Sequence, residues 1–206
     1  MTRRKFLRYT GEALFMVALA GATTRFSVAG DYVRPPGTVA EESFFRRCIK
    51  CGICVEVCPT RALDFVGLTL DVKNIGTPKL NVRHGGCMAW RKECLKCADV
   101  CPTQAIKRPA TIKDVRMGSI HIRERECINC LLCFRECPIE GALLFPNPHG
   151  APFRKTRDIP SALSDRNSPV KPCVDNSLCI GCGLCAWVCP PRCMDVLSRN
   201  ERRMRA

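Results

Sequence analysis

Large side chains are scarce in this sequence. Of its 206 residues only 6% are aromatic, whereas it contains 15 prolines and 14 glycines. A domain of this length normally uses more large apolar side chains to build its core. An ordinary hydrophobic core is therefore excluded as the main source of stability. The sequence points instead to its 18 cysteines and to whatever they bind.

Common enzyme motifs and membrane-spanning segments are also missing. The sequence has no glycine-rich phosphate loop and no organised Ser/His/Asp set. The apolar run at residues 13–22 is too short for a membrane helix, which needs about 20 residues. We therefore predict no catalytic residues, and we expect His84, His121 and His149 to be solvated rather than to bind metal.

The cysteines form a fourfold repeat. Three copies have the spacing C-x2-C-x2-C-x3-C-P, and the second copy has its first cysteine displaced to Cys87. A short apolar stretch after each copy predicts a small residue packed beneath a bound group, followed by a short strand. The motifs span residues 48–59, 87–102, 127–138 and 179–190.

This spacing is the signature of bacterial [4Fe–4S] ferredoxins, in which three cysteines of a motif bind one cluster and the fourth ligates the other cluster of a pair. Tight loops of this kind also direct backbone N–H groups at the sulfur atoms. The predicted fold is α+β, with tandem 8Fe–8S modules of short strands and helices around four clusters. The predicted ligands are Cys48, Cys51, Cys54, Cys58, Cys87, Cys94, Cys97, Cys101, Cys127, Cys130, Cys133, Cys137, Cys179, Cys182, Cys185 and Cys189.

Zinc and disulfides fit the cysteine spacing less well. Structural zinc usually binds to two separated C-x2-C pairs, and a disulfide framework does not explain the fourfold register. Two further cysteines lie outside the sixteen. Cys193 stands where Ala62 and Ala105 stand in two other repeats, which predicts a small buried filler. A disulfide between Cys193 and Cys173 is an open alternative.

The formal net charge of +14 does not indicate a nucleic-acid partner. The first 29 residues carry a net +4 of it, and four oxidised clusters with their thiolates would remove about 8 more positive charges. No basic stripe studded with aromatic residues is present. Nucleic-acid binding is therefore not expected.

The first 29 residues predict an export signal. Arg3 and Arg4 precede a short apolar run and small residues suited to cleavage after Ala29. The arginine pair matches the twin-arginine signal, which implies export of a folded, cofactor-loaded protein to the periplasm. Thiols exported unfolded into an oxidising compartment would form disulfides instead. The leader and the cysteine motifs thus both favour a periplasmic protein, with membrane association as an open alternative.

The remaining chain divides by composition. Residues 30–46 predict a linker with a short helix from about Thr38, and residues 47–200 predict the four-cluster domain. The alternating stretch before the third motif predicts a strand. A proline-rich excursion at 146–172 is either a solvated loop or a docking surface, and residues 201–206 form a basic tail.

The leader, "RPPG" (34–37), the displaced second motif and "DVRMGSIHI" (114–122) resemble the MauM/NapG ferredoxin-type proteins over essentially the whole chain. The resemblance implies an electron carrier between a membrane quinol-oxidising ferredoxin-like protein and a periplasmic redox enzyme or c-type cytochrome, in methylamine utilisation or nitrate reduction. The second motif departs from the C-x2-C-x4-C-x3-C-P expected of the nitrate-associated members, which favours the methylamine branch. The alternatives are an iron–sulfur subunit of an oxidoreductase and a maturation factor for a periplasmic dehydrogenase.

Chain lengths between the motifs do not decide which motifs exchange their fourth cysteines. The resemblance implies nested pairing, of the first motif with the fourth and of the second with the third. The expected ligand sets are then Cys48, Cys51 and Cys54 with Cys189; Cys179, Cys182 and Cys185 with Cys58; Cys87, Cys94 and Cys97 with Cys137; and Cys127, Cys130 and Cys133 with Cys101.

Overall fold

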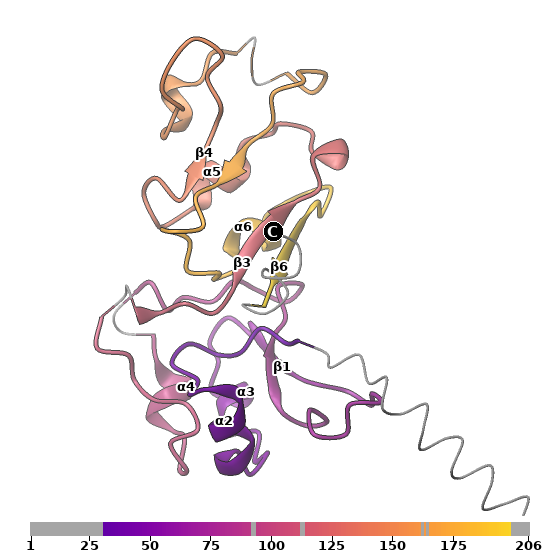
Figure 1. The fold of residues 1–206 in the computed structure, drawn as a ribbon, viewed down its shortest axis with the longest axis vertical. Helices are drawn as coiled ribbons and strands as arrows, with labels where there is room; N and C mark the ends of the chain where they lie inside the picture. The colour runs from indigo at the N-terminus through magenta and orange to yellow at the C-terminus, as the bar shows by residue number, and fades with distance from the viewer. Residues whose placement is uncertain (1–30, 92–93, 112–113, 162, 164, 199–206) are drawn as a thin grey trace, which may run out of the picture. The chain divides into compact units, whose positions relative to one another are not determined.

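The computed structural model describes residues 31–198 except 92–93, 112–113, 162 and 164 (Figure 1). The predicted export signal and the basic tail lie outside these residues. The chain divides into two compact units, and the described part of the larger one comprises residues 31–66 and 76–198 and contains all four motifs. The described part of the smaller unit is 67–75. None of the helices described is long and apolar enough to cross a membrane.

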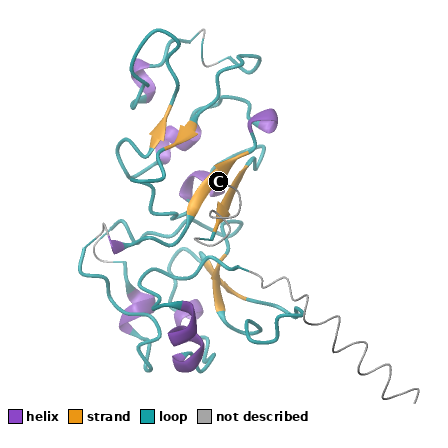
Figure 2. Cartoon of the chain, in the orientation of Figure 1, coloured by secondary structure: helices purple, strands orange, loops and turns teal. Residues whose placement is uncertain are grey.

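Short helices and strands joined by loops make up the larger unit (Figure 2). The helices are α2 (Glu41–Arg47), α3 (Ile53–Glu56), α4 (Lys96–Asp99), α5 (Leu132–Glu136) and α6 (Leu184–Trp187), with 3₁₀ turns η3 (Glu124–Glu126) and η4 (Thr156–Asp158). The strands are β1 (Leu63–Phe65), β2 (Pro78–Leu80), β3 (Ser119–Ile122), β4 (Leu143–Leu144), β5 (Cys173–Val174) and β6 (Met194–Leu197). They pair antiparallel as β1–β2, β3–β6 and β4–β5.

The strands expected around the motifs are mostly confirmed. β1, β4 and β6 follow the first, third and fourth motifs, and β3 precedes the third. After the second motif the expected strand is reduced to a single bridge between Ile106 and Thr38. That bridge and the hydrogen bond from the Thr38 hydroxyl to the Pro35 carbonyl hold Thr38 in a turn, so the helix begins at Glu41 instead.

Strand pairing joins motifs that are neighbours in the sequence. The strand after the first motif, β1, pairs with β2 ahead of the second motif, from Leu63 opposite Leu80 to Phe65 opposite Pro78. The strand before the third motif, β3, pairs with β6 after the fourth, and Ser119 lies opposite Leu197. Helix contacts follow the same division, between α3 and α4 and between α5 and α6. The third and fourth motifs thus share a framework, and so do the first and second.

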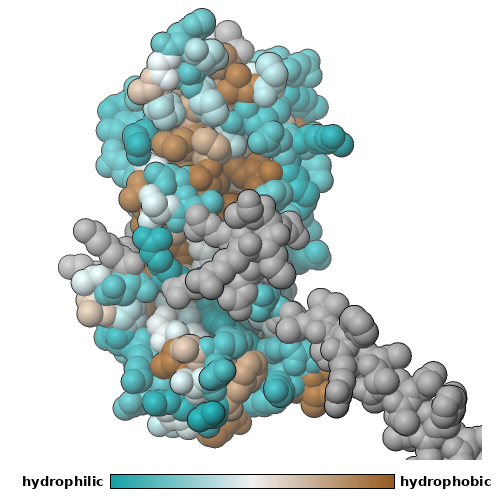
Figure 3. Space-filling model, viewed as in Figure 1, coloured by the Kyte–Doolittle hydropathy of each residue, from teal (hydrophilic) through white to brown (hydrophobic). Residues whose placement is uncertain are grey.

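The core is built largely of cysteines and aliphatic side chains. Each of its three buried hydrophobic clusters contains cysteines, and Phe44 and Phe145 are the largest side chains that are fully buried among the described residues. On the face drawn in Figure 3 the apolar areas lie mainly over the part that carries α5, β4 and α6. Among the described residues, the buried members of the three clusters include no aromatic side chain, in line with the scarcity of aromatic residues in the sequence.

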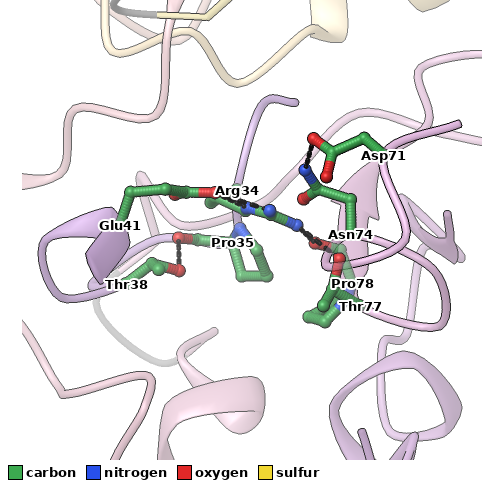
Figure 4. A network of polar contacts seen from close by, with 8 residues as sticks. All are labelled: Arg34, Pro35, Thr38, Glu41, Asp71, Asn74, Thr77 and Pro78. Atoms are coloured by element: carbon green, nitrogen blue, oxygen red, sulfur yellow. Dashed lines mark hydrogen bonds and ion pairs between the residues drawn. The ribbon is translucent and has the colours of Figure 1, made fainter. Parts of the chain in front are cut away.

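The described part of the smaller unit is the loop between β1 and β2 in the sequence. Its Leu68, Leu70 and Val72 side chains are exposed. The Asn74 amide donates a hydrogen bond of 2.6 Å to the Asp71 carboxylate (Figure 4), which closes a turn at the end of the loop.

Arg34 ties the segment ahead of the first motif to β2. Its guanidinium is buried and donates to the Thr77 hydroxyl at 2.8 Å and to the Pro78 carbonyl at 3.0 Å. On its other side it forms an ion pair with Glu41 at the start of α2 (Figure 4). The guanidinium carbon also lies 4.7 Å from the centre of the Phe44 ring. One side chain therefore satisfies polar groups from two parts of the chain beside the first motif.

We predict that Arg34→Ala lowers the free energy of unfolding of the loaded protein by about 2–4 kcal/mol, because it leaves buried acceptors without a donor. Arg34→Lys should restore only part of this, since an ammonium cannot bond in two directions as the guanidinium does. Anaerobic denaturant unfolding measures both. Arg46→Ala, at an exposed position of α2, is the control and should change stability by less than about 0.5 kcal/mol. An equally small effect of Arg34→Ala would contradict the role of the network.

Candidate iron–sulfur cluster sites

The regular cysteine loops share an unusual backbone conformation. In the first, third and fourth motifs the residues on both sides of the second cysteine have positive φ. Alternation of left- and right-handed residues turns successive N–H groups into one concavity, an arrangement that binds anions and iron–sulfur centres. Non-glycine residues in this conformation cost on the order of 1–3 kcal/mol each, and they persist only where the surroundings impose it. The residues with positive φ in these three motifs are Lys50 and Gly52, Asn129 and Leu131, and Gly181 and Gly183.

The second motif lacks this loop. Between Cys87 and Cys101 none of its described residues has positive φ. Its displaced first cysteine instead follows Gly86, where an added Cβ would lie 2.6 Å from the Leu184 Cα. Only glycine at this position permits such a close approach to α6. Cys87, the next residue, therefore lies beside the fourth motif.

A common turn follows each fourth cysteine. Arg61, Gln104 and Arg192 stand three residues after it with φ of 52–54°, and each donates its N–H to the carbonyl of that cysteine. In the third motif Gly141 has the corresponding positive φ one residue later. The turn buries the next side chain, as the sequence predicted for the small residue beneath each bound group.

The fourth cysteine of the second motif lies with the first motif. A cavity beside α3 is lined by Cys101 together with Cys48, Cys51 and Cys54. Burial, and then the thiols of Cys48, Cys51 and Cys101, raise the pKa of Cys54 to about 11. We call these four cysteines thiol group 1.

Cys58, the fourth cysteine of the first motif, lies with the second motif. Burial raises the pKa of Cys87, Cys94 and Cys97, and in each case the Cys58 thiol is among the neighbours that raise it further. For Cys97 the result is a pKa of about 12. Cys58, Cys87, Cys94 and Cys97 form thiol group 2.

The third and fourth motifs exchange cysteines in the same way. Two further cavities are each lined by four motif cysteines, three from one motif and the fourth from its neighbour. Burial, followed by Cys127, Cys130 and Cys189, raises the pKa of Cys133 to about 12. Thiol group 3 is Cys127, Cys130, Cys133 and Cys189, and thiol group 4 is Cys137, Cys179, Cys182 and Cys185.

The nested pairing expected from the family resemblance is therefore wrong. It placed Cys58 with the fourth motif and Cys189 with the first, whereas the structure places Cys58 with the second motif and Cys189 with the third. It also placed Cys101 with the third motif and Cys137 with the second, and these two lie with the first and fourth. The reason is the strand pairing, which joins each motif to its neighbour in the sequence.

The two halves of the larger unit meet between groups 2 and 4. The Cys87 N–H donates to the Cys182 carbonyl at 2.8 Å, and the Cys182 thiol is one of the neighbours that raise the pKa of Cys87, after burial and Cys97. Both cysteines are buried, whereas Cys51 in group 1 and Cys130 in group 3 are exposed. The groups thus follow the order 1, 2, 4, 3, with an exposed cysteine in each end group.

Several polar groups at the sites were missed by the sequence analysis. The Thr60 and Thr103 hydroxyls lie 3.7 and 3.8 Å from the sulfurs of Cys58 and Cys101. Burial alone would raise the pKa of Cys101, but the Ile106 N–H and the Thr103 hydroxyl help to lower it below its usual value. The repeated C-P-T in the first two motifs was the available signal, because it puts a hydroxyl two residues after each fourth cysteine.

The proline-rich excursion contacts the third motif. The Asn129 amide is buried and donates to the carbonyls of Asp165 and Val170, at 3.0 and 2.9 Å. Lys171 donates to the Cys127 carbonyl at 3.0 Å. The end of the excursion therefore packs on the loop of group 3, whereas most of its residues are exposed.

The cysteines and histidines outside the four thiol groups differ in exposure. The disulfide between Cys173 and Cys193 is absent, since both are free thiols: Cys173 is exposed on β5 and Cys193 is buried. Cys193 fills the space beneath a cysteine turn, as expected of a small residue. His84, His121 and His149 are exposed, in agreement with the expectation that they are solvated.

The donor sets fit cubane clusters. Each group offers four thiols, which is the ligand number of a [4Fe–4S] cluster, and a nest of N–H groups accompanies three of them. Among the described residues no three His, Cys, Asp or Glu side chains are grouped as a single metal ion would require. Because burial raises the pKa of thiols such as Cys54 and Cys182, both to about 11, these thiols must lose protons when they bind iron.

Pairing in sequence order can be tested with double variants. Cys58→Ala with Cys94→Ala removes two thiols from one group, so the purified protein should lose one cluster and keep about 12 irons. Cys58→Ala with Cys182→Ala removes one thiol from each of two groups and should keep about 8. Nested pairing predicts the opposite order of iron contents, which iron and acid-labile sulfide analysis would reveal.

Comparison with known proteins identifies iron–sulfur domains along the chain. A 4Fe-4S dicluster domain matches residues 47–105 and also 90–141, and a second model of the same description matches 126–193. The ferredoxin-type protein NapG of Escherichia coli is 33% identical, over 91% of this chain and 80% of its own. The methylamine utilization ferredoxin-type proteins MauM of Paracoccus denitrificans and Methylophilus methylotrophus are 29% and 32% identical, over 92% and 90% of this chain and 83% and 79% of theirs. Two dicluster domains imply four [4Fe–4S] clusters, and the chain belongs to the family of NapG and MauM ferredoxin-type iron–sulfur proteins.

Proposed function

We propose that this protein is a periplasmic electron carrier between a membrane quinol-oxidising partner and a periplasmic redox enzyme or c-type cytochrome. The observation that carries the proposal is the series of thiol groups 1, 2, 4 and 3, with an exposed cysteine in each end group. When bound, each cluster would supply a site that accepts or releases one electron. The chain supplies the order of the sites and their access to partners.

The links along the series are made by specific residues. Groups 1 and 2 are joined by their exchanged cysteines Cys58 and Cys101 and by contact between α3 and α4. Groups 4 and 3 are joined in the same way by Cys137 and Cys189. Between the two pairs the Cys87 N–H donates to the Cys182 carbonyl, which directly joins groups 2 and 4. We place the middle step of the electron path there.

The two ends offer different surfaces to partners. Beside Cys51, the Ile49 and Ile53 side chains are exposed together with Lys50, next to the basic last turn of α2. Beside Cys130, the excursion lies against the loop of group 3. Two unlike surfaces suit two different partners, as expected of a carrier between a donor and an acceptor.

The relatives support electron transfer without choosing a pathway. Their names describe ferredoxin-type proteins, and one set is named for methylamine utilization. NapG and MauM relatives match with similar identities of 28–33%, so these values do not favour the methylamine branch that the second motif suggested. We therefore propose a role in methylamine utilisation or nitrate reduction. A role as a subunit of an oxidoreductase or as a maturation factor would require a substrate or client site besides the thiol groups.

The cluster content follows directly from this proposal. Anaerobically purified protein should be brown, absorb broadly at about 400 nm, bleach with dithionite and contain about 16 irons per chain. Rapid reoxidation by a c-type cytochrome would support the carrier over a maturation factor. A colourless protein with stoichiometric zinc would overturn the proposal.

The periplasmic location can be tested through the leader. Replacement of both Arg3 and Arg4 by lysine should leave the loaded protein in the cytoplasm, because the arginine pair is the recognised element of the export signal. Fractionation followed by iron analysis measures this. Substitution of Arg8 alone, which lies outside the pair, is the control and should still permit export. Full periplasmic loading of the double lysine variant would contradict the predicted route.

A further inference from the structure

Thiol group 3 has a fifth thiol in its cavity. Cys193 lines this cavity together with Cys127, Cys130, Cys133 and Cys189. It is 1% exposed, and its sulfur lies 3.5 Å from that of Cys189. The sulfur atoms of Cys189 and Cys193 therefore lie side by side. Cys189 is the predicted fourth ligand of this group.

The other repeats show that packing does not require a thiol here. Ala62, Ala105 and Ala142 occupy the corresponding place after the first three motifs and are 0–2% exposed. Ala105 is the closest match, because it lines the cavity of group 1 just as Cys193 lines that of group 3. A methyl group is thus large enough to fill this buried space. Among the four repeats, only the fourth places a sulfur there, beside the predicted ligand Cys189.

We propose that Cys193 is a reserve ligand of the cluster held by thiol group 3, able to replace Cys189. This inference rests on the cluster content of the proposed function and adds a ligand to it. In the exchange, the iron–sulfur bond to Cys189 breaks and one to Cys193 forms. The proton of the Cys193 thiol passes to the Cys189 sulfur, so no electron is gained or lost and no further reactant is needed.

Local structure keeps the reserve thiol in reach. The turn closed by the Arg192 N–H and the Cys189 carbonyl joins the two cysteines, and β6 begins immediately after Cys193 and pairs with β3. Cys189 belongs to the fourth motif and Cys193 follows it directly, so either sulfur would hold the fourth motif to the third. The exchange therefore preserves the link between neighbouring motifs, and it does so at the end group that contains the exposed Cys130.

The test compares Cys189→Ala with the double variant Cys189→Ala, Cys193→Ala. The single variant should keep about 16 irons per chain, whereas the double variant should keep about 12. Cys101→Ala is the matched control in group 1, where Ala105 offers no replacement, and it should keep about 12. Cys193→Ala alone should keep all four clusters, because alanine fits this place in the other repeats.

Iron and acid-labile sulfide should be measured after anaerobic reconstitution of the denatured full-length chain, so that poor expression does not decide the result. Equal iron contents in the single and double variants, at any level including none, would overturn the role of Cys193. This outcome is distinct from failure of the proposed function, which would appear as a lack of clusters in the unsubstituted protein. The electron paramagnetic resonance signal of reduced Cys189→Ala should in addition differ from that of the unsubstituted protein at one cluster only.

Discussion

The exchange of fourth cysteines between neighbouring motifs is the constraint on which the rest of this structure depends. Cys101 reaches the first motif and Cys58 the second, so neither thiol group of the pair is complete without the other motif. In a chain whose buried clusters consist of cysteine, alanine, valine, leucine, isoleucine and methionine side chains, few other contacts could hold these loops together. Metal binding and folding are therefore coupled, because each cluster would bond two distant segments of chain at once. The short strands and one-turn helices mainly hold these loops in register.

The contact between the two pairs of thiol groups explains the irregular spacing of the second motif. A regular loop would hold its first cysteine in a nest of its own backbone, as in the other three motifs. The displaced Cys87 instead follows Gly86 into contact with α6 and donates its N–H to Cys182. The departure in spacing thus serves the junction between two pairs. It explains why the thiol groups form one connected series within the larger unit, and why neither inner group contains an exposed cysteine.

Local features could be predicted from the sequence, and the long-range pairing could not. The spacing of Cys48, Cys51 and Cys54 predicted one loop around one cluster, and the alternating stretch at 119–122 predicted β3, because both depend on adjacent residues. Which thiol group Cys58 joins depends on which strands pair. The chain lengths between the motifs allowed both nested pairing and pairing in sequence order. Family resemblance then selected the wrong one. The contact between Cys193 and Cys189 could not be predicted either, because it depends on the turn at Arg192.

Burial of the thiols also constrains when the clusters enter. Cys87, Cys97, Cys182 and Cys185 are buried in the finished fold, and burial raises the pKa of each of them, so they resist the loss of a proton that iron binding requires. Loading before or during folding avoids this barrier, because the unfolded thiols are solvated. A chain loaded in this way would be folded before the proposed export. The buried thiols of the inner groups therefore fit the proposed export route, in which cofactor insertion would come first and translocation would follow.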